Sequence, residues 1–552
     1  MRNNHAVSWL VALLTLVLVT ACSPAVSSTD LPEATTVSSV MCMEPSPTPA
    51  ASTTARPAVT SHPTPTPVPS PSASPAASPT PVPTLAPTLA PTVTPAVTSV
   101  TSTSTAPVTP TADTVENLHQ DALVIDAHND TVLKIIDSDT WLPKNKLSRI
   151  TNFMVDIPKL VAGGIDVATF ASYTSGYAQP EGGQDFDRAN SRLLALLNAL
   201  HWTMDQNPDT TRQVLDSNDL QNSNSQGSIG FLLSIEGAYS LNAVNSLALL
   251  RQYHDLGVLM LAPVWNYSNE LGEGTKAEYP DGSPSSGGLT DLGRTVIEEM
   301  NRLGIIVDVS HMNEQTFWDT LGISSAPVIA SHSSVDALCP NARNLTDRQI
   351  LAIADSGGLV HVNYYRNFLA GNPSSATVKT LVDHIEYIVN LAGIDHVGLG
   401  SDFDGASLPQ GLADASHVPA ITRELLERGY SYEAVGKILG GNSARVFSKI
   451  WKQATVSTSD VGPVVETDLS MGAPLAANEP LQAMITDPAT VETASLQIII
   501  DGIVYSPDYD AATGIVQIML PVSIREKFHV VTFLAKTPEG VTTRETRIFY
   551  LN

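Results

Sequence analysis

Apolar residues form eight short runs in the middle of the chain, and amphipathic helical stretches separate them. Helical periodicity is clear, for example, in 289–303 and 346–356. Short, nearly continuous apolar strands that alternate with helices are typical of a parallel sheet covered on both faces. Eight such units favour a closed, TIM-like (β/α)8 barrel over residues 115–453 rather than an open doubly wound sheet. The eight runs are 123–128, 166–173, 229–236, 258–264, 305–311, 327–332, 359–364 and 396–404.

The last part of the chain has a different pattern, in which apolar and polar residues alternate with a period of two. The runs 494–500, 514–520 and 529–535 show it, and turn sequences such as Asp501-Gly502 separate them. Short strands with frequent turn signals predict a small all-β sandwich over 485–552, which resembles the immunoglobulin-like modules of bacterial surface enzymes. The stretch 454–484 is rich in small and polar residues and is predicted to be a linker. The tail shows no catalytic or metal-binding cluster, so we expect it to have an accessory role.

The N-terminus has the layout of an export signal. Residues 1–22 open with Arg2, continue through an apolar stretch too short to span a bilayer comfortably, and end at Cys22. The segment resembles a bacterial lipoprotein signal, in which small residues precede the cysteine that receives lipid. The alternative is an ordinary secretory signal with an incidental Cys22. The lipoprotein interpretation predicts a protein held at the cell membrane by acyl chains, outside the cytoplasm.

Residues 23–114 separate this signal from the predicted barrel. They contain no Phe, Trp or Tyr and hold roughly half of the chain's 39 prolines. Such a segment cannot bury enough apolar surface to offset its ordering entropy, so it predicts an extended, disordered stalk. A ligand for proline-recognition domains is the alternative interpretation.

Charge and cysteine content narrow the function further. The 29 Lys and Arg against 55 Asp and Glu give a net charge of −26, which argues against a nucleic-acid partner. This charge does not argue against a membrane, because attachment through acyl chains needs no basic surface. Three cysteines cannot make a disulfide framework, and Cys339 is interpreted as structural.

Side chains suited to binding metal occur at the C-terminal ends of five of the predicted strands. In a barrel these ends meet on one face, where active sites lie. Imidazole and carboxylate suit Zn²⁺, and so large a set fits a two-metal centre with a bridging carboxylate and a shared, deprotonated water. Glu236 is the best candidate for the bridge. A phosphoesterase or a cyclic-amide hydrolase uses similar centres, so the set alone leaves the substrate open. Its members are His128, Asp130, Glu236, His311, His332 and Asp402.

Ordered motifs along residues 114–452 give the chain a family resemblance. It resembles the membrane (renal) dipeptidases, zinc-dependent metallopeptidases of the amidohydrolase-type barrels. The resemblance rests on Ile-Asp-Ala-His-Asn-Asp at 125–130, Ser-Ile-Glu-Gly at 234–237 and Ile-Val-Asp-Val-Ser-His at 306–311. It continues with Ala-Ser-His-Ser-Ser at 330–334 and Gly-Leu-Gly-Ser-Asp-Phe-Asp-Gly at 398–405.

The resemblance implies a role for each matching residue. His128 and Asp130 would bind one zinc ion, His311 and His332 the second, and Glu236 both. Asp402 would be the catalytic acid that passes a proton from a metal-bridging hydroxide toward the leaving amine, and Arg343 would pair with the terminal carboxylate of a dipeptide. Members of the family often pair as homodimers, although the sequence shows no interface signal.

One position departs from the family pattern. Better-known members have a His after the fourth strand that contacts the substrate carbonyl, whereas Trp265 stands there in this chain. Trp can donate one hydrogen bond but cannot become cationic, so we weigh a different amide or lactone hydrolase on the same site as an alternative. A surface-binding scaffold is a third reading, which the intact ligand set opposes. The nearby Asn266 and Asn269 either line the pocket or cap the loop, and capping is the favoured interpretation.

Overall fold

The computed structural model describes residues 111–175, 185–275, 287–455, 462–486 and 491–552. The predicted signal peptide, Cys22 and all of the predicted stalk up to residue 110 lie outside the described residues. Residues 100–552 belong to one compact unit. Within the described part of the chain, no helix has the length and apolar character needed to cross a membrane.

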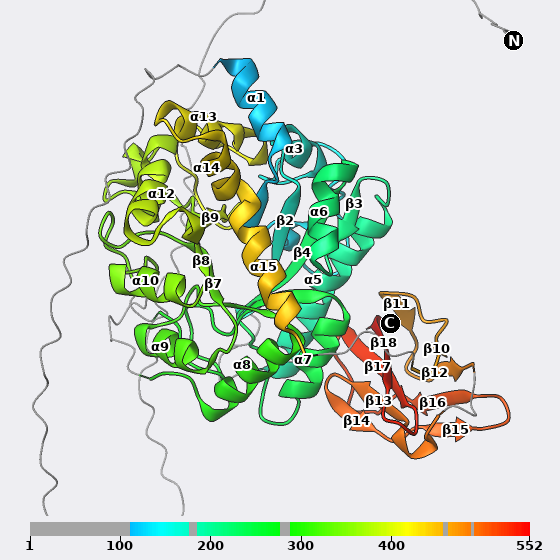
Figure 1. The fold of residues 1–552 in the computed structure, drawn as a ribbon. Coiled ribbons are helices and arrows are strands. Elements are labelled where there is room, and N and C mark those ends of the chain that lie inside the picture. Colours follow the sequence, from blue (N-terminus) through cyan, green and yellow to red (C-terminus); the bar gives the residue numbers. More distant parts are fainter. Residues whose placement is uncertain (1–110, 176–184, 276–286, 456–461, 487–490) are drawn as a thin grey trace, which may run out of the picture. The chain divides into compact units, whose positions relative to one another are not determined.

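Eight parallel strands form the closed barrel that the apolar runs predict (Figure 1). The sheet order is β2-β1-β9-β8-β7-β6-β5-β4, and pairing of β2 with β4 closes it. All eight predicted strands are confirmed. A short strand that the pattern did not show, β3, adds to the outer side of β4. The strands are β1 (Ile125–Asn129), β2 (Val167–Tyr173), β3 (Thr211–Gln213), β4 (Ile229–Glu236), β5 (Val258–Ala262), β6 (Ile306–Asp308), β7 (Val328–Ser333), β8 (Leu359–Asn363) and β9 (Val397–Gly400).

Helices connect the strands and surround the barrel (Figure 1). Their ends follow local sequence signals: Thr290 caps α8, and Thr346 with Gln349 forms a capping box that starts α10. The helices are α1 (Ala112–Asp121), α2 (Val132–Ile135), α3 (Ile157–Ala162), α5 (Phe186–Asp205), α6 (Ser217–Gln226), α7 (Ser246–Asp255), α8 (Asp291–Leu303), α9 (Glu314–Ile323), α10 (Asp347–Asp355), α11 (Arg366–Leu369), α12 (Val378–Ala392), α13 (Pro419–Glu427), α14 (Tyr432–Gly436) and α15 (Asn442–Gln453).

The two ends of the barrel differ in composition. Apolar residues from the first halves of several strands, among them Ile125, Ile306 and Leu359, form one buried cluster with Val446 and Phe447 of α15. This cluster closes the N-terminal end of the barrel. The polar residues therefore collect at the C-terminal end, where the loops after the strands begin.

The C-terminal module consists of two β-sheets with a hydrophobic core between them, as the period-two pattern predicts. One sheet has the order β10-β12-β16-β15 and the other β11-β18-β17-β13-β14. The strands are β10 (Val465–Glu466), β11 (Ala473–Leu475), β12 (Pro480–Ile485), β13 (Gln497–Ile500), β14 (Ile503–Tyr505), β15 (Asp508–Asp510), β16 (Ile515–Met519), β17 (Phe528–Lys536) and β18 (Thr542–Leu551).

The predicted linker over 454–484 needs correction. The described part of this stretch contributes β10, β11 and most of β12 to the module, so the module begins near residue 465 rather than 485. Backbone pairing explains why these strands form, since β12 adds to β16 and β11 adds to β18. Short strands of this kind are stabilised by the sheet they join rather than by their own sequence.

The module packs directly on helices α5 and α7 of the barrel. Phe528, Val530 and Ile548 are fully buried within the main hydrophobic cluster of the barrel. The amide of Gln252 on α7 donates to the carbonyl oxygen of Ile499 at 3.0 Å and accepts from the backbone N–H of Gly502 at 2.7 Å. Apolar burial and hydrogen bonds thus join the two parts.

Candidate metal centre

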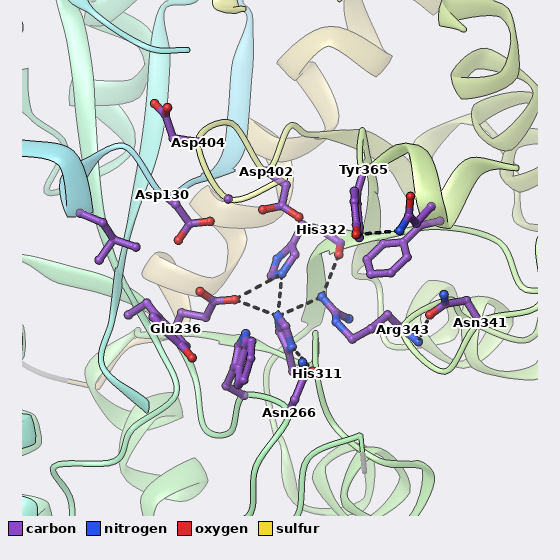
Figure 2. Close-up of a pocket in the computed structure, with 16 residues that line it drawn as sticks. Asp130, Glu236, Asn266, His311, His332, Asn341, Arg343, Tyr365, Asp402 and Asp404 are labelled. Carbon is purple, nitrogen blue, oxygen red and sulfur yellow. Dashed lines mark hydrogen bonds and ion pairs between the residues drawn. The ribbon is translucent and has the colours of Figure 1, made fainter. Parts of the chain in front are cut away.

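All six predicted metal-type residues lie together at the C-terminal end of the barrel. Figure 2 shows the five that line the pocket, all but His128. His128 belongs to β1 and Asp130 follows it, Glu236 ends β4, and His332 lies in β7. His311 and Asp402 come directly after β6 and β9. The structure therefore brings together side chains that are up to 274 positions apart in the sequence.

Ring nitrogens and carboxylate oxygens converge on one small space. The Nε2 atom of His311 lies 2.8 Å from Oε1 of Glu236 and 2.8 Å from Nε2 of His332. His332 Nε2 is 3.4 Å from the same Glu236 oxygen, and His128 Nε2 is 3.8 Å from it. His128 Nε2 is also 3.8 Å from Oδ2 of Asp130. Glu236 thus stands between the histidines, as expected for the bridging position.

Hydrogen bonds behind His311 and His332 fix which ring nitrogen faces this space. Nδ1 of His311 lies 2.8 Å from Oδ1 of Asn266, which is an acceptor, so Nδ1 carries the proton. The hydroxyl of Ser331 donates to Asp308 at 2.5 Å and therefore accepts from Nδ1 of His332 at 2.7 Å. Both rings consequently present the lone pair of Nε2 to the site, the tautomer that metal binding requires.

His128 completes the set, and its ring stacks on that of His332 with 3.7 Å between centroids. Its Nε2 atom is buried and has no hydrogen-bond partner among the described residues. Gly405 leaves room here, because a Cβ at this position would lie 1.9 Å from Oδ2 of Asp130 and 2.5 Å from Oδ1 of Asp402. A buried nitrogen without a hydrogen-bond partner costs free energy unless it binds another group.

The electrostatics of the site call for a positive charge. Burial raises the pKa of Glu236 to about 8 and that of Asp402 to about 6, and the charge of Asp130 adds to both shifts. Burial, together with the nearby Arg343 and His128, lowers the pKa values of His311 and His332 well below the ordinary value. Burial opposes a charge on His128, but Glu236 and Asp130 outweigh it and raise its pKa to about 10, so without a cation this ring carries the positive charge among the carboxylates. The neutral rings of His311 and His332 beside crowded carboxylates are donors that a divalent cation prefers.

These observations agree on a metal-binding role for the cluster. Two groups of three donor atoms lie within 4.8 Å of one another, one made of His128, Glu236 and His332 and the other of His128, Asp130 and Asp402. The unpartnered Nε2 of His128, the oriented lone pairs and the crowded carboxylates all fit bound metal ions.

Asp402 is held differently from the other carboxylates. Its Oδ2 accepts a hydrogen bond from the side-chain amide of Asn363 at 2.9 Å. Its φ of 60° and that of His311, 69°, lie in the left-handed region, which costs free energy for residues other than glycine. Such backbone conformations persist where surrounding contacts enforce them, and they cluster at functional sites.

A pocket opens beside the cluster, and both predicted substrate-binding residues line it. Arg343 is 3% exposed as a whole residue. Its Nη2 atom lies 3.0 Å from Nε2 of His311 and donates to the carbonyl oxygen of His332 at 3.3 Å. The ring of Trp265 lies 5.6 Å from that of His311, measured between centroids. The pocket volume is about 580 Å³, which suits a small ligand.

Several residues that line or support the pocket are not among the predicted site residues. Asn363 ends β8 and Tyr173 ends β2, so the strand-end rule itself points to them. Asn266, for which loop capping was favoured, contacts His311 and lines the pocket. Asn269 does cap the loop, since its Oδ1 accepts from the backbone N–H of Leu271 at 2.9 Å.

Comparisons with known proteins agree with this geometry. The profile of the membrane dipeptidase family (peptidase family M19) matches residues 112–460. Dipeptidase aclJ from Aspergillus oryzae is 34% identical over 54% of this chain and 70% of its own length. An uncharacterized protein in the pqqA 5' region of Klebsiella pneumoniae is 39% identical over 44% of this chain and 90% of its own length.

Solved structures show the same relationship. A metallopeptidase from Rhodobacter sphaeroides, solved with a phosphinate mimic of the dipeptide L-Ala-D-Ala, superposes with a TM-score of 0.53 at 28% identity. The match covers 60% of this chain and all of that one (100%). Family profile, relatives and barrel agree: the chain belongs to the membrane dipeptidase family, peptidase family M19, and is a metallo-dipeptidase.

Proposed function

We propose that this enzyme uses two zinc ions to hydrolyse the peptide bond of small dipeptides outside the cytoplasm. The observation that carries the proposal is the position of Arg343, a buried guanidinium that borders the same pocket as the metal-type cluster. A cation at that position fixes the end of a short peptide, and the cluster acts on the bond beside it. The solved relative that holds a phosphinate dipeptide mimic supports the same substrate class.

Zinc is the metal that fits the donors best, since they are imidazole nitrogens and carboxylate oxygens. His128 and Asp130 would hold one ion, His311 and His332 the other, and Glu236 both. When bound, such a pair supplies an activated water near neutral pH and polarises the substrate carbonyl. Asn266 and Ser331 keep the two ring nitrogens aimed at the site throughout.

Arg343 binds the carboxylate at the C-terminus of the substrate. Its guanidinium is planar and remains charged, so it pairs with a carboxylate through two parallel hydrogen bonds. The contact to the carbonyl oxygen of His332 and the stacking on Phe368, 5.5 Å from the ring centroid, hold it in place. The pocket therefore accepts a peptide whose C-terminus lies one residue from the bond that breaks.

Asp402 transfers the proton that the leaving amine requires during hydrolysis. Its carboxylate lies beside Asp130, and burial raises its pKa to about 6, so it is a base at neutral pH that accepts a proton readily. Asn363 holds the carboxylate from behind through one oxygen, which leaves the other for the reacting groups. Asp402 then gives the proton to the leaving amine.

Arg343 also favours a dipeptidase over a lactone or other amide hydrolase on the same site. A lactone has no terminal carboxylate that could form the two parallel hydrogen bonds with the guanidinium of Arg343. Trp265 lines the same pocket but carries no charge, so it does not change this preference.

The decisive experiment compares dipeptides with their C-terminal amides. The zinc-loaded enzyme should hydrolyse the free acids at least about 100-fold more efficiently than the amides, and Arg343→Met should lose most of that difference. Two bound zinc ions by elemental analysis, with no turnover of any dipeptide, would instead favour the second hydrolase. Fewer than one metal per chain would contradict the metal centre.

The location of the enzyme rests on its N-terminal sequence. We propose that Cys22 is lipidated and that acyl chains anchor the protein at the cell membrane, on the outer side. Metabolic labelling with a fatty-acid analogue should mark the full-length protein, and Cys22→Ser should lose the label and leave the membrane fraction. A labelled Cys22→Ser variant would contradict the assignment. Homodimer formation remains a prediction, which light scattering of the purified enzyme would test.

A further inference from the structure

We infer that Tyr173, Trp265 and Leu133 form a subsite for an apolar side chain on the N-terminal residue of the dipeptide. The inference rests on the proposed dipeptidase function and adds the class of substrate. It starts from the lining of the pocket, where these three apolar or aromatic side chains accompany Asp130 and Glu236. In Figure 2, Asn341 and Tyr365 lie beside Arg343, whereas Asp130 and Asp404 lie away from it.

Tyr173 and Trp265 make a continuous aromatic wall. Their ring centroids are 5.0 Å apart in an edge-to-face arrangement, which is a favourable geometry for aromatic pairs. Tyr173 ends β2, and Trp265 lies in the loop that follows β5. Burial raises the pKa of Tyr173, so its hydroxyl stays neutral in the pocket.

The wall is held rigidly from behind. Trp265 packs on the fully buried Tyr239, whose hydroxyl donates to the carbonyl oxygen of Tyr267 at 2.7 Å. The ring of Tyr267 lies 5.3 Å from that of Trp265. Gly237 allows this packing: its φ is 80°, and a Cβ there would lie 2.4 Å from the Tyr239 ring and 3.3 Å from Cβ of Trp265. A preformed wall binds an apolar group without an ordering cost.

The direction of the substrate follows from Arg343. If the terminal carboxylate pairs with Arg343 and the scissile carbonyl lies at the metal-type cluster, the N-terminal residue extends toward Asp130, away from Arg343 (Figure 2). Leu133 lines the same pocket. The acids there suit its ammonium group, and the wall beside them suits an apolar side chain. An acidic side chain at the same place would meet Asp130 and Asp404 and be repelled.

The leaving residue meets different surroundings. On the Arg343 side the pocket is lined by Asn341, Asn367 and Tyr365, with Phe368 beneath the guanidinium. Amide and hydroxyl groups accept small or polar side chains and gain little from apolar ones. The structure therefore assigns the stronger apolar selectivity to the N-terminal residue.

Two series of dipeptides test the assignment, one with a variable N-terminal residue before alanine and one with a variable C-terminal residue after alanine. In the first series, Phe and Leu should exceed Asp by at least about tenfold in kcat/KM. Trp265→Ala should remove most of the preference for Phe over Ala in that series. Asn341→Ala, the matched change on the opposite side, should leave that ratio unchanged and alter only the second series.

Binding measurements keep the two proposals separate. Phosphinate mimics of Phe-Ala and Ala-Ala should bind the zinc-loaded protein with the same order of preference, measured by calorimetry, and Trp265→Ala should remove it. Discrimination between the mimics without dipeptide turnover would overturn the proposed function and leave the subsite intact. Turnover with no preference in the first series, or an equal loss on all substrates in Trp265→Ala, would overturn the subsite.

Discussion

Two buried clusters in this chain join histidine to a carboxylate, one at the top of the barrel and one where the module meets α5. In the second cluster Nδ1 of His529 contacts Asp501 at 2.6 Å, and Nε2 contacts the carbonyl oxygen of Glu526 at 2.8 Å. Asp501 in turn accepts from Asn190 of α5 at 2.9 Å. Every ring nitrogen there already has a partner within the protein.

The barrel cluster is built in the opposite way. Hydrogen bonds at Nδ1 of His311 and His332, to Asn266 and Ser331, leave the Nε2 atoms of three histidines turned toward one space, where Nε2 of His311 also meets Arg343 at 3.0 Å. Among the described residues, groups of three metal-type side chains occur only at this end of the barrel. A histidine that the protein holds through Nδ1 can bind a ligand through Nε2. A histidine whose two ring nitrogens both have fixed protein partners, such as His529, has a structural role. Four measurements test that distinction.

The largest effect is expected for Asp402→Asn. The amide keeps the shape of the carboxylate but cannot take up a proton, so kcat should fall by about 10²- to 10⁴-fold. The zinc content should remain that of the wild type. The same change at the exposed Asp355 on α10 is the control and should leave kcat unaltered. Wild-type rates in Asp402→Asn would show that this carboxylate does not transfer the proton.

Asn266→Ala tests whether the hydrogen bond behind His311 matters for metal binding. Loss of the acceptor frees the ring to rotate or to change tautomer, so zinc affinity should weaken by about 10- to 100-fold in chelator competition. Asn269→Ala, in the same loop, removes a loop cap without touching His311 and should retain the affinity. Equal zinc affinities in the two variants would show that packing alone orients His311.

Gln252→Ala tests a second polar group at the module interface, one whose hydrogen-bond partners also lie within the protein. The side chain is fully buried, and its amide group contacts the carbonyl oxygen of Ile499, the hydroxyl of Thr532 and the backbone N–H of Gly502. Leaving these groups unpaired should lower the free energy of unfolding by about 1–3 kcal/mol in urea titration. The exposed Gln315→Ala should change it by less than about 0.5 kcal/mol. A Gln252→Ala variant as stable as the wild type would mean that water replaces the amide.

The sequence predicts the barrel well because its strands are buried on both faces and stand out as apolar runs. It fails near residue 480 for a physical reason: β12 alternates buried and exposed positions, yet Pro480 and Met484 on its exposed face are themselves apolar, which hides the period of two. The strand-end rule located the metal-type residues because each carries ligand chemistry in its own side chain. The strand-end rule does not predict the roles of Asn266 and Trp265, because these roles depend on the orientation of side chains in a loop.

The smallest effect concerns the pH dependence of the His529 cluster. Burial disfavours the charged ring, but the carboxylate of Asp501 outweighs it, so the pKa of His529 lies above its ordinary value of 6.5. A raised pKa in the folded state means that the pair stabilises fully below the unfolded value and that this stability is lost as the pH rises through the folded value. The wild type should therefore lose more stability between about pH 6 and pH 9 than His529→Asn does, in thermal unfolding at each pH. Parallel pH profiles for the two proteins would show that the ring stays neutral, and the contrast between the clusters would then rest on hydrogen bonding without charge.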